Sequence, residues 1–349
     1  MLRRFSQNRW LYNVAEGRPR ALVRLVVQTG LYYTVNLLLY ALLGFLFFAV
    51  LPTAEGLNDG QIMQTPSFML TATIVTGLGV LGSVWLAGRF LDHRPFADFG
   101  MGFDRAWWGD LVVGMGLGAL LMAGIFAVQL RAGWLTITQS MAGRDLASVM
   151  AGLLAPLILY VAVGVYEEVL FRGYRMRNLA EGLNLSQVDP RWALVGAWLL
   201  SSIWFGLAHR NNPNASLISN INLALAGLML GLAYLFTGRL GLSIGLHITW
   251  NFFQGSIFGF PVSGTRIFPD SLIQIEQGGP DLWTGGSFGP EAGLLGIFAM
   301  AIGCLLILAW VRIQQGQVAP HLPLTVYRPR HPQTERADST STTDLNTES

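Results

Sequence analysis

The sequence predicts an all-α membrane protein, a polytopic bundle of about eight transmembrane helices with both termini in the cytoplasm. Three observations support this fold class. Hydrophobic residues make up 52% of the 349-residue chain and charged residues only 12%, and the mean hydropathy of +0.46 lies well above the range of soluble domains. The apolar residues gather in eight long runs, and most of the arginines lie on one side of the membrane that these runs predict.

Each apolar run can cross a hydrocarbon layer of ~30 Å as a helix, because a helix satisfies its own backbone hydrogen bonds in lipid. The first run lacks a small-residue cleavage site, so we expect a retained span rather than a signal peptide. The sixth and seventh runs are separated only by Thr237, Gly238 and Arg239, which predicts a tight helical hairpin. The predicted spans are 25–52, 67–88, 109–130, 147–170, 192–209, 217–237, 240–257 and 292–311.

Arginine placement predicts the orientation, because short cytoplasmic loops retain positive charge. With the N-terminus inside, 18 of the 22 arginines fall in cytoplasmic segments, and the outer segments hold only Arg131, Arg144, Arg210 and Arg266. Residues 1–24 are then a cytoplasmic segment and 25–312 the intramembrane bundle. Residues 313–349 form a Pro-, Ser- and Thr-rich cytoplasmic tail, whose composition predicts disorder. We expect a multi-pass protein of the inner (plasma) membrane.

Composition also limits the partners and the chemistry. A net charge of +2 gives no basis for binding nucleic acid, so the lipid bilayer is the first partner expected. The single cysteine, Cys304, excludes an intramolecular disulfide and a cysteine-based metal site. The chain contains no Lys, which points to a GC-rich genome and a bacterial source.

Ionisable residues inside apolar spans are costly, so each one is a candidate functional residue until a structural partner explains it. The first cluster is Glu167-Glu168-Val-Leu-Phe-Arg172, at the end of the fourth run. On a helix, Glu168 and Arg172 share a face and can pair, whereas Glu167 points about 100° away. A carboxylate shielded from water is suited to proton transfer, so Glu167 is a candidate general base; a juxtamembrane ion-pair network is the structural alternative.

Two further clusters follow along the chain. Phe205-Gly-Leu-Ala-His209 closes the fifth run, where a histidine can also serve as a helix cap. His247 and Asn251 lie inside the seventh run, and their four-residue spacing places an imidazole and a carboxamide on one helix face. Such groups have no reason to enter lipid unless they meet partners in the bundle.

The relative depth of Glu167 and His209 decides whether they form one site. If the fourth helix continues to about Leu183 and the chain turns near Val188, both residues lie 21 positions from the turn and at equal depth. Centring each hydrophobic run on the bilayer instead separates them by roughly 27 Å. We favour the paired arrangement, because a buried Glu and a buried His would otherwise each lack a partner.

These motifs, Glu-Glu-x-x-x-Arg, Phe-x-x-x-His and His-x-x-x-Asn in this order on successive helices, resemble the CPBP intramembrane endopeptidases. That family includes the CAAX prenyl endopeptidases and the bacteriocin-processing or self-immunity proteins. The resemblance covers about residues 156–251, within a predicted protease core of about 147–257. The segment Gly285-Gly-Ser-Phe-Gly-Pro-Glu-Ala-Gly293 is also similar to one found before the last helix in bacterial members.

The resemblance implies that Glu167 is the catalytic carboxylate and that His209 helps it to activate the attacking water. His247 and Asn251 would stabilise the tetrahedral oxyanion, with Glu168 and Arg172 as supporting residues. A peptide or protein is then the substrate, although a prenylated C-terminus is not expected in a bacterium. Zinc is possible as a cofactor, with Glu167, His209 and His247 as ligands, but no His-Glu-x-x-His motif occurs, and we favour a metal-independent mechanism.

Three alternatives remain to be weighed. A non-catalytic scaffold or bacteriocin self-immunity protein would keep the fold, but it has no need to retain all four polar residues in lipid. A transporter predicts an internal repeat with broken helices, which the sequence does not show. The stretch Gly241-Leu-Ser243-Ile-Gly245 matches the nucleophile pattern of serine hydrolases, yet it begins a membrane helix instead of joining a strand to a helix, so only a packing role is expected for Ser243.

Overall fold

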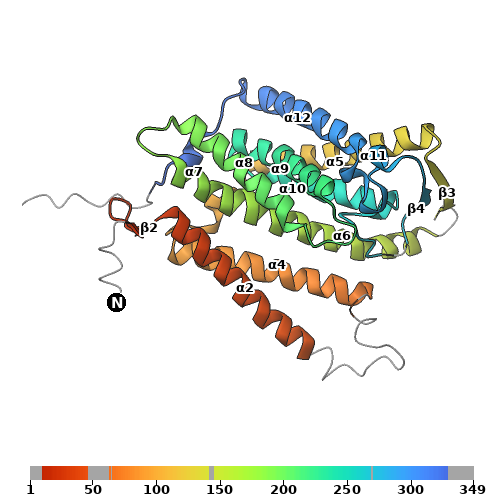
Figure 1. Cartoon of the computed structure of the whole chain (residues 1–349), viewed down its shortest axis with the longest axis horizontal. Helices are drawn as coiled ribbons and strands as arrows, with labels where there is room; N and C mark the ends of the chain where they lie inside the picture. Colours follow the sequence, from red (N-terminus) through yellow and green to blue (C-terminus); the bar gives the residue numbers. More distant parts are fainter. Residues whose placement is uncertain (1–9, 46–62, 64, 141–144, 269, 329–349) are drawn as a thin grey trace, which may run out of the picture.

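A computed structural model describes residues 10–45, 63, 65–140, 145–268 and 270–328, and it confirms an all-α polytopic bundle (Figure 1). In these ranges, seven helices are long and apolar enough to cross a membrane. The fourth is a continuous helix in three parts, α6, the π-helix η3 and α7. The seven are α2 (Ala21–Phe45), α4 (Pro66–Phe90), α5 (Arg105–Arg131), α6 (Leu146–Glu168) with η3 (Val169–Met176) and α7 (Arg177–Leu183), α8 (Pro190–Ala208), α9 (Leu217–Thr237) and α12 (Leu294–Gln315).

The predicted span 240–257 is helical, but it is not one of these seven. It consists of α10 (Gly241–Phe252) and the π-helix η4 (Phe253–Ile257). Residues 241–250 are all buried, and α10 packs against α5, α6 and α9. This short helix therefore lies at the centre of the bundle rather than against lipid. The other predicted spans correspond to the observed helices, and residues 46–52 of the first lie outside the described ranges.

Side chains in the connecting segments set where several helices begin. Asp104, Asp145 and Asp189 each accept a hydrogen bond from a backbone N–H in the first turn of α5, α6 and α8, which satisfies a donor that the helix leaves free. Gly238 ends α9 in the left-handed conformation with a φ of 66°. That residue forms the predicted tight hairpin between α9 and α10, because glycine adopts this conformation without steric cost.

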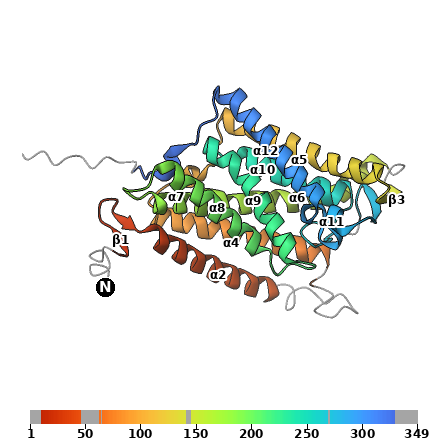
Figure 2. The same cartoon turned by 45° about the horizontal axis from the view of Figure 1, so that its top comes forward.

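The helices are arranged in layers. The pair α2 and α4 covers one face of the molecule, and α12 lies with α5 on the opposite face (Figures 1 and 2). Two small antiparallel sheets lie at the ends, β1 (Tyr12–Asn13) with β2 (Arg18–Pro19) and β3 (Leu135–Ser140) with β4 (Ile273–Gln277). The remaining short elements are η2 (Phe96–Phe99), α11 (Asp281–Thr284), η5 (Gly286–Phe288), η6 (Pro290–Ala292) and η7 (Leu322–Thr325).

A buried group of charged residues joins the elements at one end of the bundle. We call Arg18, Arg24, Asp92, Arg94 and Glu181 the terminal ionic cluster. Glu181 on α7 forms ion pairs with Arg18 and Arg94, with nitrogen–oxygen distances of 2.9 and 2.6 Å. Nε of Arg24 lies 3.1 Å from Oδ1 of Asp92. Because buried charges are tolerated only with partners, the cluster fixes the N-terminal hairpin and the loop after α4 against α7.

The chain after α12 returns to this same end. His321 donates its backbone N–H to the carbonyl of Leu235, Leu324 is 2% exposed, and the guanidinium of Arg18 lies 3.6 Å from the ring centre of Tyr327. Part of the segment expected to be a disordered tail, up to residue 328, is therefore packed on the bundle by apolar and cation–π contacts. The structure does not describe 329–349.

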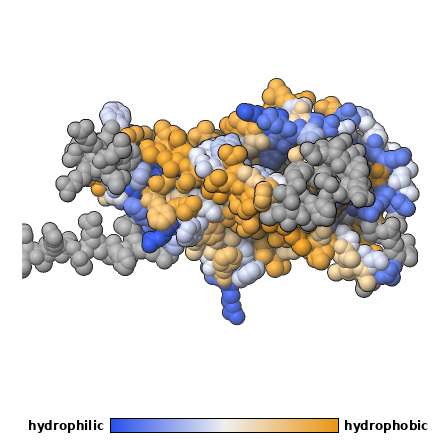
Figure 3. Space-filling model, turned by 90° about the horizontal axis from the view of Figure 1, so that it is seen from below, coloured by the Kyte–Doolittle hydropathy of each residue, from blue (hydrophilic) through white to orange (hydrophobic). Residues whose placement is uncertain are grey.

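The surface shows how the bundle meets lipid. Seen from below, apolar residues cover much of the molecule and hydrophilic residues gather toward the right-hand end (Figure 3). Leu37, Leu120 and Phe298 are large apolar residues that are more than half exposed. Two arginines assigned to a cytoplasmic segment, Arg172 and Arg175, instead lie buried in η3, so they do not contribute to the charge of that surface.

Candidate active site

Three helices carry the three polar motifs to one place. Glu167 and Glu168 are the last residues of α6, His209 directly follows α8, and His247 and Asn251 lie on α10. The helix containing α6 continues to Leu183, and α8 begins at Pro190, as the paired arrangement requires.

Glu167 lies between the two histidines. Its Oε1 is 3.9 Å from Nε2 of His209, and its Oε2 is 3.8 Å from Nε2 of His247. The alternative that separates Glu167 from His209 by roughly 27 Å is therefore wrong. It failed because the α6 helix extends well past its apolar run, so the centre of that run does not mark the centre of the helix.

These residues line a cavity of about 620 Å³. Glu167, His209, His247 and Asn251 all contribute to its wall, together with residues of the loops that follow α8 and η4. Oε2 of Glu167 is buried and has no hydrogen-bond partner among the described residues. A buried carboxylate oxygen of this kind requires a polar partner, and the cavity is large enough for water or for a peptide segment.

The hydrogen bonds of the two imidazoles fix which nitrogen faces Glu167. Nδ1 of His209 lies 2.9 Å from the backbone carbonyl of Phe205, which can only accept, so Nδ1 carries the proton. Nδ1 of His247 lies 2.8 Å from Oε1 of Glu168 and donates to that carboxylate. Both histidines therefore direct Nε2 toward Glu167.

Glu168 has two partners and no exposure to solvent. Its Oε1 accepts from Nη1 of Arg172 at 2.8 Å, which is the predicted pair, and from His247, a contact that the sequence did not indicate. Arg172 also donates to the carbonyl of Gly227 at 3.0 Å and lies 4.5 Å from the ring centre of Phe205. Glu168 thus connects the η3 arginine to the α10 histidine.

Glu167, His209 and His247 are the residues that a zinc ion would require as ligands. Zinc holds its ligands at ~2.0–2.2 Å around one point. In the described part of the chain, no group of three His, Cys, Asp or Glu side chains is arranged to hold a metal ion. The two histidines approach different oxygens of Glu167, at 3.9 and 3.8 Å, so the proposed zinc ligands do not fit a shared ion in this arrangement.

Ser243 lies outside the cavity lining. Its hydroxyl donates to the carbonyl of Leu230 at 2.8 Å, and the residue is 0% exposed. This serine is a buried packing residue, and Gly241 and Gly245 on either side of it lie against the backbone of α5.

Glu291 also lines the cavity, and sequence reasoning missed it as a site residue. It lies in η6, inside the segment 285–293, and is 3% exposed. Burial raises the pKa of its carboxyl to about 7, although Ser263 and Gln254 donate hydrogen bonds to it. In the sequence, Glu291 is an acidic residue among glycines before an apolar run. That pattern could have marked it as a candidate, but it does not show that the residue is buried.

Residues 149–253 match the model of a family described as type II CAAX prenyl endopeptidase, Rce1-like. This match supports the resemblance to the CPBP family that the motifs indicate. It covers Glu167, Glu168, Arg172, His209, His247 and Asn251, but not Glu291. At the level of class, it supports a membrane-embedded protease. No curated protein matches the chain. No solved structure matches it either.

Proposed function

We propose that the protein is an intramembrane endopeptidase in which Glu167 activates water for attack on a peptide bond. The observation that carries the proposal is the convergence of Glu167, His209 and His247 from three helices on one cavity, with spacings of 3.9 and 3.8 Å. These spacings are too long for direct hydrogen bonds, but a water molecule beside the pair, on the cavity side, can hydrogen-bond to both the carboxylate oxygen and Nε2.

The bonds of His209 suit it to position that water. With its proton on Nδ1, the neutral imidazole presents an acceptor at Nε2, and Glu167 presents a second acceptor at Oε1. A water that donates one hydrogen to each has its oxygen lone pairs free for the substrate carbonyl carbon. Glu167 takes a proton as the new C–O bond forms, and it returns that proton to the amine nitrogen as the C–N bond breaks.

His247 and Asn251 then act on the carbonyl oxygen. Asn251 lies one helical turn after His247 on the same cavity wall and can donate from its amide. His247 can donate from Nε2 only as an imidazolium, since Glu168 already receives its Nδ1 proton. In that form, Glu167 and Glu168 are balanced by Arg172 and His247, so the buried cluster is neutral, and the cation faces the developing oxyanion.

The substrate of this proposal is a peptide or protein that reaches the cavity from the bilayer, and we place the protein in the inner (plasma) membrane. The seven apolar helices support a multi-pass protein. The alternative of a non-catalytic scaffold or self-immunity protein predicts that no peptide is cleaved.

The test is proteolysis of a peptide library by the full chain purified in detergent. Glu167→Gln should lower turnover by about 10²–10⁴-fold, because it removes the general base while keeping the side-chain volume. Glu276→Gln is the matched control, since Glu276 is exposed on β4. Chelators and metal analysis of the purified protein test the zinc alternative. Wild-type protein that cleaves nothing, or a fully active Glu167→Gln, would reject the proposal.

A further inference from the structure

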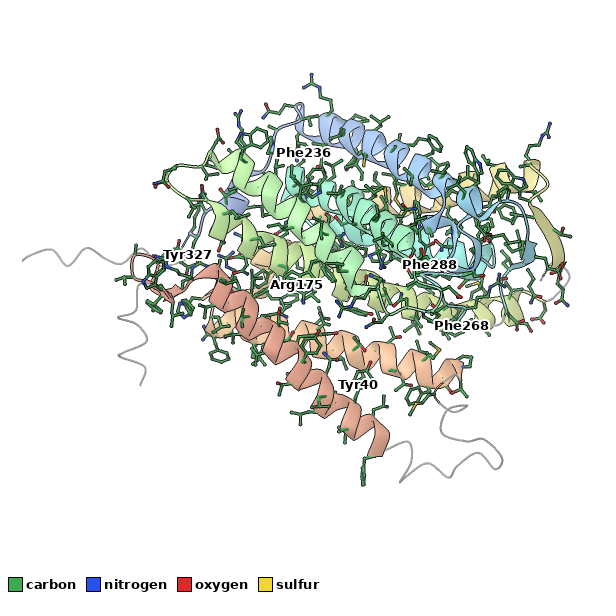
Figure 4. All side chains as sticks on the ribbon, viewed as in Figure 1. Tyr40, Arg175, Phe236, Phe268, Phe288 and Tyr327 are labelled. Atoms are coloured by element: carbon green, nitrogen blue, oxygen red, sulfur yellow. The ribbon has the colours of Figure 1, made fainter. Side chains whose placement is uncertain are left out.

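Arg175 is a buried cation on the wall of the candidate active-site cavity. It lies in η3, eight residues after Glu167, and it is 4% exposed. Figure 4 shows it in the interior of the molecule, between α2 and the helices that carry the site.

Two aromatic rings hold the guanidinium of Arg175 in place. Its central carbon lies 3.8 Å from the ring centre of Trp204 and 4.8 Å from that of Phe171. Stacking of this kind is favourable for arginine, but it leaves the N–H donors at the edge of the guanidinium plane without acceptors.

Within the described part of the chain, Arg175 forms no ion pair, and its Nε is buried without a hydrogen-bond partner. Arg172, three residues earlier, is the internal comparison. It is equally buried, but it pairs with Glu168 and donates to the carbonyl of Gly227. A buried charge without a counter-ion is unfavourable, so a cation held in this way needs an anion from outside the described structure.

We propose that Arg175 binds a carboxylate of the peptide substrate, three or four residues away from the bond that is cleaved. The proposal rests on the endopeptidase function proposed above. Eight helical residues separate Arg175 from Glu167 by about 12 Å along the axis, and an extended peptide advances about 3.3 Å per residue. A guanidinium can receive both oxygens of a carboxylate at once, which makes Arg175 a specificity-determining residue.

A peptide carboxylate suits the site better than a lipid phosphate does. Arg175 shares its cavity with Glu167, His209 and His247, where a bound peptide would have to lie. Anionic headgroups meet cations at the membrane surface, whereas the Arg175 side chain is almost completely enclosed.

The experiment measures kcat/KM for matched peptides that share one cleavable sequence. One set carries Asp or Asn at each of the second to sixth positions on either side of the scissile bond, and a second set ends in a free or an amidated C-terminus. These two sets distinguish a side-chain carboxylate from a terminal one. The proteins are wild type, Arg175→Gln, Arg175→Lys and the control Arg191→Gln, because Arg191 is exposed at the start of α8.

Wild type should prefer the carboxylate at the third or fourth position by about 10–100-fold, mainly through KM. Arg175→Gln should lose this preference, so that its kcat/KM values for the Asp and Asn members of a pair become equal, and Arg175→Lys should retain part of the preference. The proposal is overturned if wild type shows no carboxylate preference at any position, a result that needs no variant to fold. It is also overturned if Arg175→Gln keeps the preference, or lowers kcat/KM for both members of a pair equally.

Binding of the same peptides to Glu167→Gln, measured by fluorescence anisotropy, separates this proposal from the proposed function. If carboxylate peptides bind in a manner that depends on Arg175 but wild type cleaves none of them, the endopeptidase function is rejected and the anion site is retained. Cleavage without carboxylate preference would reject only the anion site. If Arg175→Gln instead loses a co-purified anionic phospholipid in native mass spectrometry, with peptide preference unchanged, the site belongs to lipid and the proposal fails.

Discussion

At the residue scale, the adjacent carboxylates Glu167 and Glu168 have different surroundings and should tolerate the same substitution differently. Glu168→Gln removes the charge that Arg172 and His247 share. Arg172 is 1% exposed, so it would be left without its counter-ion, at a cost of about 3–5 kcal/mol. We expect a lower Tm and lost turnover for Glu168→Gln, but an almost unchanged Tm for Glu167→Gln. Thermal unfolding of both variants in detergent measures this, and equal stability of the two would show that the roles are assigned wrongly.

Asn251 is expected to act only on the transition state. Loss of one oxyanion donor typically lowers turnover by ~10²–10³-fold, so Asn251→Ala should lower kcat by about that factor and leave KM little changed. Ser243→Ala is the control on the same helix, since that hydroxyl bonds the carbonyl of Leu230 outside the cavity lining. An active Asn251→Ala together with an inactive Ser243→Ala would reverse the interpretation.

Glu291 should make stability depend on pH. Its pKa is about 7 in the folded protein against 4.5 for the free side chain, so the folded state holds the proton more tightly. The stability that this provides is fully present below pH 4.5 and is lost as pH rises through 7, by about 3 kcal/mol in total. Tm measured from pH 4 to 8 should fall more for wild type than for Glu291→Gln. Parallel curves would show that Glu291 does not titrate in this range.

The sequence identifies polar residues that interrupt an apolar run. It does not identify polar residues that lie outside such runs and become buried only when the chain folds. Glu167, His247 and Asn251 interrupt apolar runs and could therefore be predicted. Arg175 follows such a run and lies near Arg172 and Arg177, so the sequence there is typical of a positively charged cytoplasmic loop. Glu291 lies in a glycine-rich connection. Only the packing of η3 and η6 shows that these two residues are enclosed.

At the element scale, glycines allow α10 to lie directly against α5. A Cβ on Gly245 would lie 2.2 Å from the carbonyl oxygen of Leu111, and one on Gly118 would lie 2.4 Å from that of Leu246. Close backbone contact through small residues is a common way to pack membrane helices. Here it fixes the height and rotation of the helix that carries His247 and Asn251.

Gly245→Ala should therefore displace α10 and disturb His247, two residues further along. We expect a loss of about 1–3 kcal/mol in stability and a marked fall in turnover. Gly116→Ala on α5 is the matched control, because a Cβ there meets nothing within 4 Å and Ala favours a helix by up to ~1 kcal/mol. Thermal unfolding and peptide cleavage of both variants test the contact. Two variants with the same stability would contradict it.

The positions of the helices can be predicted from hydropathy. The places where an α-helix changes into a π-helix cannot. Apolar length predicted where α5, α6 and α8 lie, because lipid requires a continuous helix. The two π-helices, η3 and η4, begin directly after or shortly after the site residues of α6 and α10, and no pattern in the sequence marks them. The same holds for α10, whose apolar run is typical of a span although neighbouring helices enclose it.

At the scale of the whole molecule, the bundle places its N-terminal hairpin and its C-terminal segment at one end, and the strands β3 and β4 at the other (Figure 1). The arginine distribution predicts that the first end is cytoplasmic. Reporter fusions after Ser349 and within 258–290 should then report the cytoplasm and the outer side, respectively. A periplasmic signal from the C-terminal fusion would refute this orientation.

The cavity should be reached by water from the outer side. Asn212 lines it and donates to the carbonyl of Ser263 at 2.9 Å, at the end of the bundle away from the termini. In a Cys304→Ala background, Asn212→Cys should react with a membrane-impermeant maleimide added outside intact cells. Arg191→Cys, at the start of α8 and on the side predicted to be cytoplasmic, should react only after the cells are opened. The reverse pattern would contradict the predicted orientation.

The contact between Arg18 and Tyr327 also bears on the order of assembly. The ribosome releases Arg18 more than three hundred residues before Tyr327, so the N-terminal hairpin must enter the membrane interface with one side of its guanidinium uncovered. Glu181 becomes available only when α7 has been inserted, and the aromatic ring arrives after α12. The terminal ionic cluster is thus completed late in biogenesis. The contact between Arg18 and Tyr327 can form only in a polypeptide that has been synthesised at least as far as Tyr327.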